Sequence, residues 1–71
     1  MIIDLNSNFY NFDAVKKTAF IFEREELGNF KVYKEGKKIK VKIRNINKEL
    51  KEPVRMNFFN YALSETINYE K

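Results

Sequence analysis

The 71-residue chain contains no cysteine, no histidine and no tryptophan. Without cysteine no disulfide can support the fold, and thiol content says nothing about the redox compartment. Without cysteine and histidine the chain has no thiol nucleophile, no imidazole base and no ligand set for structural zinc. We therefore expect a domain that holds neither a metal nor a cofactor and whose stability comes from packing alone.

Glycine, proline and long apolar runs are also scarce. The only glycines are Gly28 and Gly36, so the sequence has no glycine-rich phosphate loop, and Pro53 is the single proline. No apolar run approaches the ~18 residues of a membrane span. The first five residues, MIIDL, have neither the basic region nor the apolar length of a signal peptide. Since repeats and linkers are also absent, we predict one cytoplasmic domain over residues 1–71 that does not enter a membrane.

Aromatic residues and lysine are abundant instead. Seven phenylalanines and four tyrosines make up 15% of the chain, a large apolar area for a domain near the lower size limit. The 14 Lys and Arg residues outnumber the 10 Asp and Glu residues, which gives a formal charge of +4. This excess is compatible with nucleic acid, anionic lipid or an acidic peptide as partner, and it does not choose among them.

Residues 30–44 predict a β-hairpin, because apolar residues alternate with lysines on both sides of a turn. We place the turn at Glu35-Gly36. In this register the opposing pairs are Lys34–Lys37, Val32–Ile39, Phe30–Val41 and Gly28–Ile43. The apolar residues then share one face of the hairpin. The other face, which we call the basic face, carries Lys31, Tyr33, Lys38, Lys40, Lys42 and Arg44.

A first helix is predicted over residues 12–27. Asn11 is a typical N-cap for it. Gly28 is expected to end the helix, because glycine adopts the left-handed conformation of the residue after the C-cap without penalty. The inward stripe of this helix consists of Phe12, Val15, Ala19 and Phe22.

A second helix is predicted over residues 53–69, with Pro53 at its first position. The expected buried stripe is Met56, Phe59, Leu63 and Ile67, with Ala62 beside them. A second apolar row, Val54, Phe58 and Tyr61, is expected to face outward and to bind a second copy or another protein. The alternatives are a helix buried deeply enough to cover both rows, or Phe58 packed against the loop of residues 45–52.

Residues 2–5 complete the element order as a short first strand with Ile3 and Leu5 inward. The order β-α-β-β-α with a right-handed crossover leaves room for the third strand between the first two. We therefore predict a two-layer α+β fold: a three-stranded antiparallel sheet of order 1-3-2 with both helices on one face, a truncated ferredoxin-like arrangement. The free edge of the first strand carries no Pro or Lys, and we expect Ile2 and Asp4 to bind a partner there.

The charged residues predict binding rather than catalysis. Carboxylates are scattered along the chain, and a two-layer domain of this size rarely encloses the pocket that acid–base chemistry needs, so we predict no enzymatic activity. The basic face has two interpretations. It is either an electrostatic platform for phosphates or an acidic peptide, or the solvated half of an amphipathic hairpin. Only Tyr33 is available on it for stacking with a base.

Three features together resemble a known family: Tyr10-Asn11-Phe12-Asp13-Ala14-Val15-Lys16-Lys17 at the start of the first helix, the lysine-alternating hairpin, and Phe59-Asn60-x-x-Leu63 in the last helix. Over nearly the whole chain they look like the small HxsD-type proteins of His-Xaa-Ser peptide maturation systems. Those systems pair a ribosomally made precursor with radical S-adenosylmethionine enzymes. The family's last helix usually has an acidic residue after the Asn and an Arg further on. Here Tyr61 follows Asn60, and residues 64–66 are Ser-Glu-Thr.

The resemblance implies a non-enzymatic accessory protein that binds the precursor peptide or a radical S-adenosylmethionine enzyme of a ribosomal peptide maturation system. The open edge of the first strand suits that role, because an extended leader peptide can add to it as a further strand. A function from a different class is a small nucleic-acid-binding domain that uses the basic face. Self-association into a homodimer, through the first strand or the second helix, is compatible with the first hypothesis.

Overall fold

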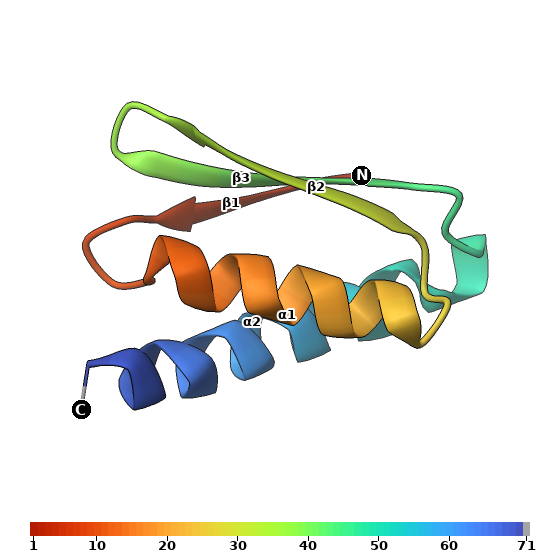
Figure 1. Ribbon diagram of the computed structural model, residues 1–71. Helices are drawn as coiled ribbons and strands as arrows, with labels where there is room; N and C mark the ends of the chain where they lie inside the picture. Colours follow the sequence, from red (N-terminus) through yellow and green to blue (C-terminus); the bar gives the residue numbers. More distant parts are fainter. Residues whose placement is uncertain (71) are drawn as a thin grey trace.

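The fold places one three-stranded sheet against two helices (Figure 1). The computed structural model describes residues 1–70. In chain order its elements are β1 (Ile2–Asn6), α1 (Phe12–Arg24), β2 (Asn29–Glu35), β3 (Lys38–Arg44), the 3₁₀ turn η1 (Lys48–Leu50) and α2 (Lys51–Tyr69). The strand order is β1-β3-β2, both pairings are antiparallel, and both helices cover the same face. The α+β fold with sheet order 1-3-2 is therefore confirmed.

The core lies between the sheet and the helices. Ile3 and Leu5 of β1 are buried, as predicted, and they pair with Val41 and Ile39 of β3. β3 buries every second residue, so the central strand contributes its three apolar side chains to one face only. This strict alternation fixes the face of a half-buried strand, and it leaves the lysines of β3 on the opposite side of the sheet.

The hairpin register differs from the prediction by two residues. The turn residues are Gly36 and Lys37, so Val32 pairs with Val41. Gly36 has a φ of +62°, and a positive φ at the first turn residue alone matches a type II′ turn. The predicted turn would have required that strained conformation at Glu35. Because a shift of two residues keeps each side chain on its face, the composition of the basic face is unchanged.

The start of α1 is set by a side-chain cap. The Asn11 side-chain oxygen accepts a hydrogen bond from the Ala14 N–H at 3.0 Å, which confirms the predicted N-cap. The inward stripe is confirmed as well and consists of the half-buried Phe12 and the buried Val15, Ala19 and Phe22. α1 packs along β2, the strand that follows it in the chain.

The end of α1 comes earlier than predicted. The helix stops at Arg24, because Glu26 adopts the left-handed conformation with a φ of +58°. The Leu27 N–H then donates back to the Phe22 C=O at 3.2 Å, which is the long bond of a Schellman motif. The prediction that Gly28 ends the helix in this conformation is therefore wrong.

Gly28 has a different role, which is to let two chain segments approach closely. Its φ is +140°, and a Cβ at this position would lie 3.0 Å from the Arg44 carbonyl oxygen and 3.1 Å from Ile43 Cγ2. Only glycine fits such a contact without a shift of the backbone. The residue therefore brings the start of β2 against the end of β3.

α2 begins two residues before the predicted position. Asn47 caps η1 by accepting a hydrogen bond from the Glu49 N–H at 2.9 Å, and η1 continues directly into α2 at Lys51. Pro53 is therefore the third helical residue and not the first. The position is still compatible with proline, because the first four N–H groups of a helix have no partner within it.

The buried face of α2 differs from the predicted one. Its buried residues recur every four positions and are Val54, Phe58, Ala62 and Thr66. Three residues of the predicted buried stripe are exposed, since the exposed fractions of Met56, Leu63 and Ile67 are 61%, 44% and 50%. Phe59 is half-buried, and Ala62 is buried as predicted. The predicted outward row is wrong, because Val54 and Phe58 are buried and only Tyr61 of that row reaches solvent. Val54 and Phe58 are therefore core residues, closed to a partner.

Tertiary contacts determine which face of α2 is buried. Phe58 is fully buried, and its ring centroid lies 5.2 Å from that of Phe22 and 5.8 Å from that of Phe30. At the other end of the row, Thr66 Oγ1 accepts a hydrogen bond from the Asn11 N–H at 3.0 Å. A buried hydroxyl with a partner is tolerated in a core. Contacts between distant segments thus outweigh the apolar count of the helix itself.

Candidate functional site

β1 is an edge strand whose outer side is unpaired in residues 1–70. Met1 and Ile43 exchange two hydrogen bonds, of 3.0 and 2.8 Å. Hydrogen-bonded pairs alternate along an antiparallel ladder, so Ile3 bonds to β3 in the same way. The backbone N–H and C=O groups of Ile2 and Asp4 therefore point to the open side. These are the two residues that the sequence assigns to a partner at this edge.

The open stretch of the edge is short. Beyond Asp4, the Asn6 C=O accepts hydrogen bonds from the N–H groups of Phe9 and Tyr10, each at 3.0 Å. The loop after β1 thus closes that end. β1 has five residues, which span about 17 Å at ~3.4 Å per residue. The edge has room for one short extended segment.

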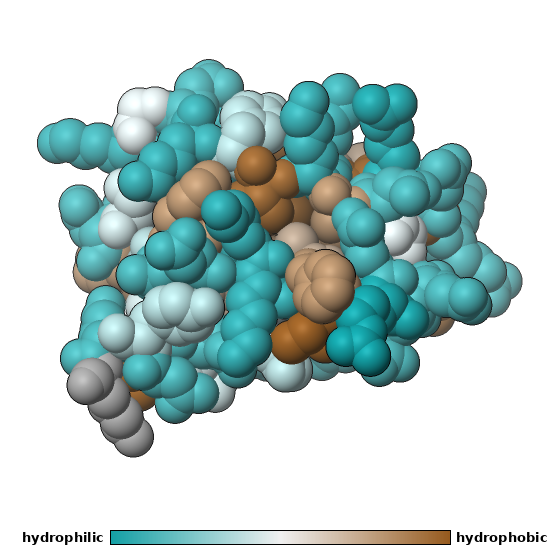
Figure 2. Space-filling model, in the orientation of Figure 1, coloured by the Kyte–Doolittle hydropathy of each residue, from teal (hydrophilic) through white to brown (hydrophobic). Residues whose placement is uncertain are grey.

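The other edge of the sheet, along β2, is protected by α1. The Glu23 carboxylate accepts the Phe30 N–H at 2.9 Å, which occupies one donor of this edge. The Lys34 ammonium lies 5.2 Å from the ring centroid of Phe12. On this side of the molecule, apolar side chains gather between α1 and the hairpin and polar ones surround them (Figure 2). Because a carboxylate already caps one N–H of the β2 edge, β1 is the more open edge of the sheet within residues 1–70.

An exposed apolar stripe runs along α2. It consists of the half-buried Phe59 and the exposed Met56, Leu63 and Ile67. Two other residues of α2 mark the side that faces α1: Glu65 Oε2 lies 3.1 Å from Lys17 Nζ, and the Tyr61 ring centroid lies 6.0 Å from that of Phe22. At 100° per residue these two positions and the stripe are on opposite sides of the helix. The stripe therefore faces away from α1.

The stripe and the open edge lie on the same side of the molecule. α1 packs along β2, and β1 is the opposite edge of the sheet, so the flank of α2 that faces away from α1 is the flank on the β1 side. Phe59 is the innermost residue of the stripe, because it packs against the hydrophobic core cluster. We call the backbone of Ile2 and Asp4 together with this stripe the edge site.

Two polar residues border the stripe. Asn60, which matches the family motif, is exposed and lies one turn from both Met56 and Leu63. The Arg55 guanidinium lies 5.2 Å from the ring centroid of Phe59. The stripe is therefore flanked by an amide and a cation, which can bind polar groups of a ligand that covers the apolar surface.

The outer face of the sheet carries the basic face. The structure places Lys31, Tyr33, Lys38, Lys40, Lys42 and Arg44 together there. Lys31 lies directly opposite Lys42, and Tyr33 lies opposite Lys40. Lys40 Nζ lies 3.4 Å from Asp4 Oδ1. Asp4 therefore contributes its backbone to the edge site and its carboxylate to the basic face.

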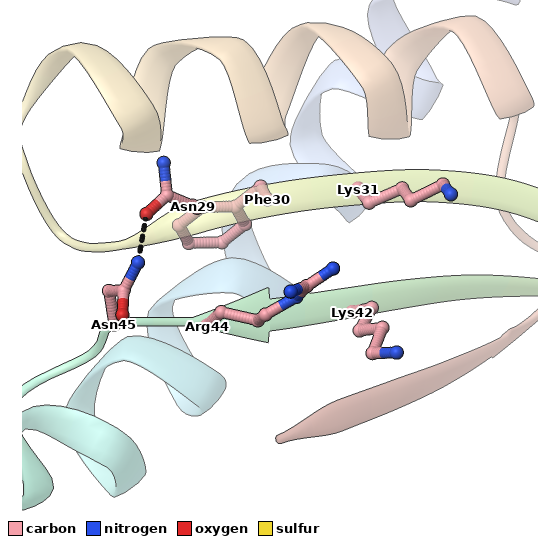
Figure 3. A pocket seen from close by; sticks show the side chains of 6 residues that line it. All are labelled: Asn29, Phe30, Lys31, Lys42, Arg44 and Asn45. Atoms are coloured by element: carbon pink, nitrogen blue, oxygen red, sulfur yellow. Dashed lines mark hydrogen bonds between the residues drawn. The ribbon is translucent and has the colours of Figure 1, made fainter.

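A shallow depression lies at one end of the basic face, where β2 begins and β3 ends (Figure 3). Its volume is about 330 Å³, and it is lined by Asn29, Phe30, Lys31, Lys42, Arg44 and Asn45. Asn45 Nδ2 donates to Asn29 Oδ1 at 2.7 Å, which joins the two chain segments that flank the hairpin. The sequence analysis missed these two amides. The available signal was their position, since each asparagine directly adjoins the hairpin of residues 30–44.

Groups suited to catalysis are not assembled in the described part of the chain. Among residues 1–70, no three Asp or Glu side chains come together as a metal site would require. The hydrogen bond and the charge of Glu65 raise the pKa of Lys17, but this ion pair joins the two helices and lies on the helix layer. The arrangement offers an open strand edge, an apolar stripe and a cationic surface, which are binding features.

The chain matches no protein-family model, no curated protein and no solved structure. The resemblance to HxsD-type proteins therefore stays a prediction that rests on its motifs, and the function has to be inferred from the geometry of the site. In residues 1–70, none of the helices combines the length and the apolar character needed to cross a membrane.

Proposed function

We propose that the protein is a non-enzymatic accessory protein of the cytoplasm that binds an extended peptide segment along β1. The observation that carries this proposal is the edge site, where open backbone groups of Ile2 and Asp4 lie on the same side as an exposed apolar stripe. The resemblance to HxsD-type proteins adds the source of the segment, which is a precursor peptide or a radical S-adenosylmethionine enzyme of a ribosomal peptide maturation system.

The edge site defines the chemistry of the segment it would take. A strand added to β1 bonds to the N–H and C=O groups of Ile2 and Asp4 and lies about 4.8 Å from β1. Its side chains alternate, so every second one faces the helix layer, where Phe59 and Leu63 offer apolar surface. We therefore expect an amphipathic segment with apolar residues at alternate positions. The Arg55 guanidinium, which lies beside the Phe59 ring, can donate hydrogen bonds to a carboxylate of that segment.

Affinity purification of the tagged protein from its native host, with nuclease present and with mass spectrometric identification, tests the proposal. We expect recovery of a short peptide or of a radical enzyme. Met56→Lys should weaken that recovery about tenfold, because a charge replaces apolar contact worth about 1.5 kcal/mol. Phe20→Lys is the matched control, since Phe20 and Met56 are both 61% exposed and Phe20 lies on the solvent side of α1. Equal recovery from both variants would contradict the edge site.

A second pair of variants tests the backbone contribution. Asp4→Ala removes only the ion pair with Lys40, whereas Asp4→Pro also removes the N–H that points to the open edge. We expect binding to survive the first change and to be lost with the second. Loss with both would instead assign the binding to the Asp4 carboxylate.

Nucleic-acid binding through the basic face is the alternative function, favoured by the cations gathered around Tyr33. It requires an affinity that falls steeply with salt. It also requires loss of binding in the double variant Lys40→Glu, Lys42→Glu, and an unchanged affinity would rule it out.

A second copy of the chain could also occupy the edge site. In that case the sedimentation coefficient would rise with protein concentration, and Met56→Lys would abolish the rise. Recovery of a different protein by the wild type, together with a constant sedimentation coefficient, would exclude the homodimer.

A further inference from the structure

Three cations that line the depression at the end of the basic face form no ion pair within the described residues. The ion pairs within residues 1–70 join Lys16 to Asp13, Lys17 to Glu65 and Lys40 to Asp4. None of them involves Lys31, Lys42 or Arg44. The carboxylate that approaches the start of β2 belongs to Glu23, and it is already hydrogen-bonded to a backbone N–H.

The register places the bases of these side chains close together. Lys31 and Lys42 are direct partners of the antiparallel pairing, so their Cβ atoms lie roughly 4.5–5.5 Å apart on the same face. Like charges in such a pair are destabilising. Arg44 projects from the same face two residues further along β3, and its side chain extends towards the space between the two lysines (Figure 3). A bound anion would remove this repulsion, whereas solvent only screens it.

The depression is also bounded by fixed groups. The hydrogen bond of 2.7 Å between Asn45 and Asn29 closes its end, and Asn45 holds a φ of +56°, which asparagine tolerates better than most residues. A volume of about 330 Å³ falls within the range of small-molecule sites. The end of the hairpin thus offers a defined place for a small anion and not only a surface charge.

We propose that this depression binds a phosphate group, either as inorganic phosphate or as the phosphate of a mononucleotide. The Arg44 guanidinium can donate two parallel N–H bonds to phosphate oxygens, and each lysine supplies a point charge. The site lies on the outer face of the sheet between β2 and β3, and it shares no residue with the edge site, although its Lys42 pairs with Ile2 of β1. It therefore stands independently of the peptide-binding function.

The test is a titration of the ¹⁵N-labelled protein with inorganic phosphate at constant ionic strength, followed by amide chemical shifts, with sodium chloride as reference. We expect saturable shifts at residues 29–31 and 42–45. The double variant Lys42→Gln, Arg44→Gln should bind at least about fivefold more weakly. The matched control Lys37→Gln, Lys38→Gln removes the same charge at the turn and should keep the wild-type affinity. Shifts that do not saturate, that chloride reproduces, or that both double variants lose equally would overturn the site.

Two further ligands distinguish the sources of the phosphate. Tighter binding of adenosine monophosphate than of inorganic phosphate would assign the site to a mononucleotide, and equal binding would assign it to free phosphate. A short single-stranded oligonucleotide should compete with phosphate at this end of the sheet. If instead both double variants weaken the oligonucleotide equally and phosphate shows no saturable binding, the whole basic face binds nucleic acid and the localised site is wrong.

Discussion

Single residues show how strongly packing between segments controls this small domain. Phe58 is fully buried between two other rings, whereas Met56, two residues earlier on the same helix, is 61% exposed. We expect Phe58→Ala to lower the free energy of unfolding by about 3–5 kcal/mol. Met56→Ala should lower it by about 0.5 kcal/mol or less. Denaturant unfolding followed by circular dichroism checks both, and a larger loss at Met56 would mean that α2 buries its other side.

Alanine substitutions at Gly28 and Gly36 distinguish the stability cost of backbone strain from the cost of a steric contact. Both have positive φ, of +140° and +62°, so alanine is strained at either position. At Gly28 the added Cβ would also lie 3.0 Å from the Arg44 carbonyl oxygen, whereas at Gly36 no atom lies within 4 Å. We therefore expect Gly28→Ala to destabilise the fold by about 1–3 kcal/mol and Gly36→Ala by less. Thermal melts of the two variants give the comparison, and equal shifts in melting temperature would show that the steric contact at Gly28 contributes nothing.

At the scale of elements, β3 and α2 differ in how well the sequence determines them. In β3 every second residue is apolar and the others are charged, so only one face can be buried. In α2 two rows of residues could face the core, and the more apolar row, which forms the stripe, is the exposed one. The inner row includes Thr66, whose burial depends on a hydrogen bond from Asn11. A hydrogen bond between residues 55 positions apart does not affect the hydrophobic periodicity of the helix. That periodicity therefore could not predict which face of α2 is buried.

The register of the hairpin could not be predicted from the hydrophobic pattern either. Alternation determines which residues share a face, so the basic face could be predicted, but it does not distinguish registers that differ by two residues. The turn chemistry does, because both favoured two-residue turns need a positive φ at their first residue, which Gly36 adopts without penalty and Glu35 does not. The open edge at Ile2 and Asp4 was likewise predictable, since strand order follows from topology rules. The apolar stripe was not, because it requires the face of α2.

The contact between the helices gives a pH-dependent prediction. Glu65 raises the pKa of Lys17 above its ordinary value of 10.5 through a hydrogen bond and its charge. A raised pKa in the folded state stabilises the fold fully below the unfolded value and no longer does so once the pH exceeds the folded value. The wild type should therefore exceed Lys17→Gln in stability by a constant amount below the ordinary lysine pKa of 10.5, and the difference should shrink as the pH rises through the raised pKa of the folded state. A difference that grows with pH would show that the ion pair does not stabilise the fold.

At the scale of the whole molecule, two features that favour aggregation lie on one side, namely the open edge of β1 and the exposed apolar stripe of α2. The domain measures 33 × 23 × 17 Å, so its two layers leave little depth for an enclosed pocket. Its surface therefore has to carry its function. An unguarded strand edge invites aggregation, and an exposed apolar stripe lowers solubility. The Glu23 carboxylate caps one N–H of the β2 edge, whereas the Asp4 carboxylate of β1 pairs with Lys40 and leaves the outer N–H and C=O groups of this strand uncapped within residues 1–70. This asymmetry is what a site for an extended partner requires.

Amide hydrogen exchange of the free protein tests that asymmetry without a known ligand. The Ile3 and Leu5 N–H groups bond to β3, whereas the Asp4 N–H points to the open side, so Asp4 should exchange fast between two slow neighbours. On the β2 edge, Phe30 should exchange more slowly than Val32, because Glu23 accepts its N–H. Protection of Asp4 that rises with protein concentration would identify a second copy on β1, and protection that appears only with the recovered peptide would identify that peptide as the added strand. If Asp4 is as protected as Ile3 in the dilute protein, β1 has no open edge and the edge site does not exist.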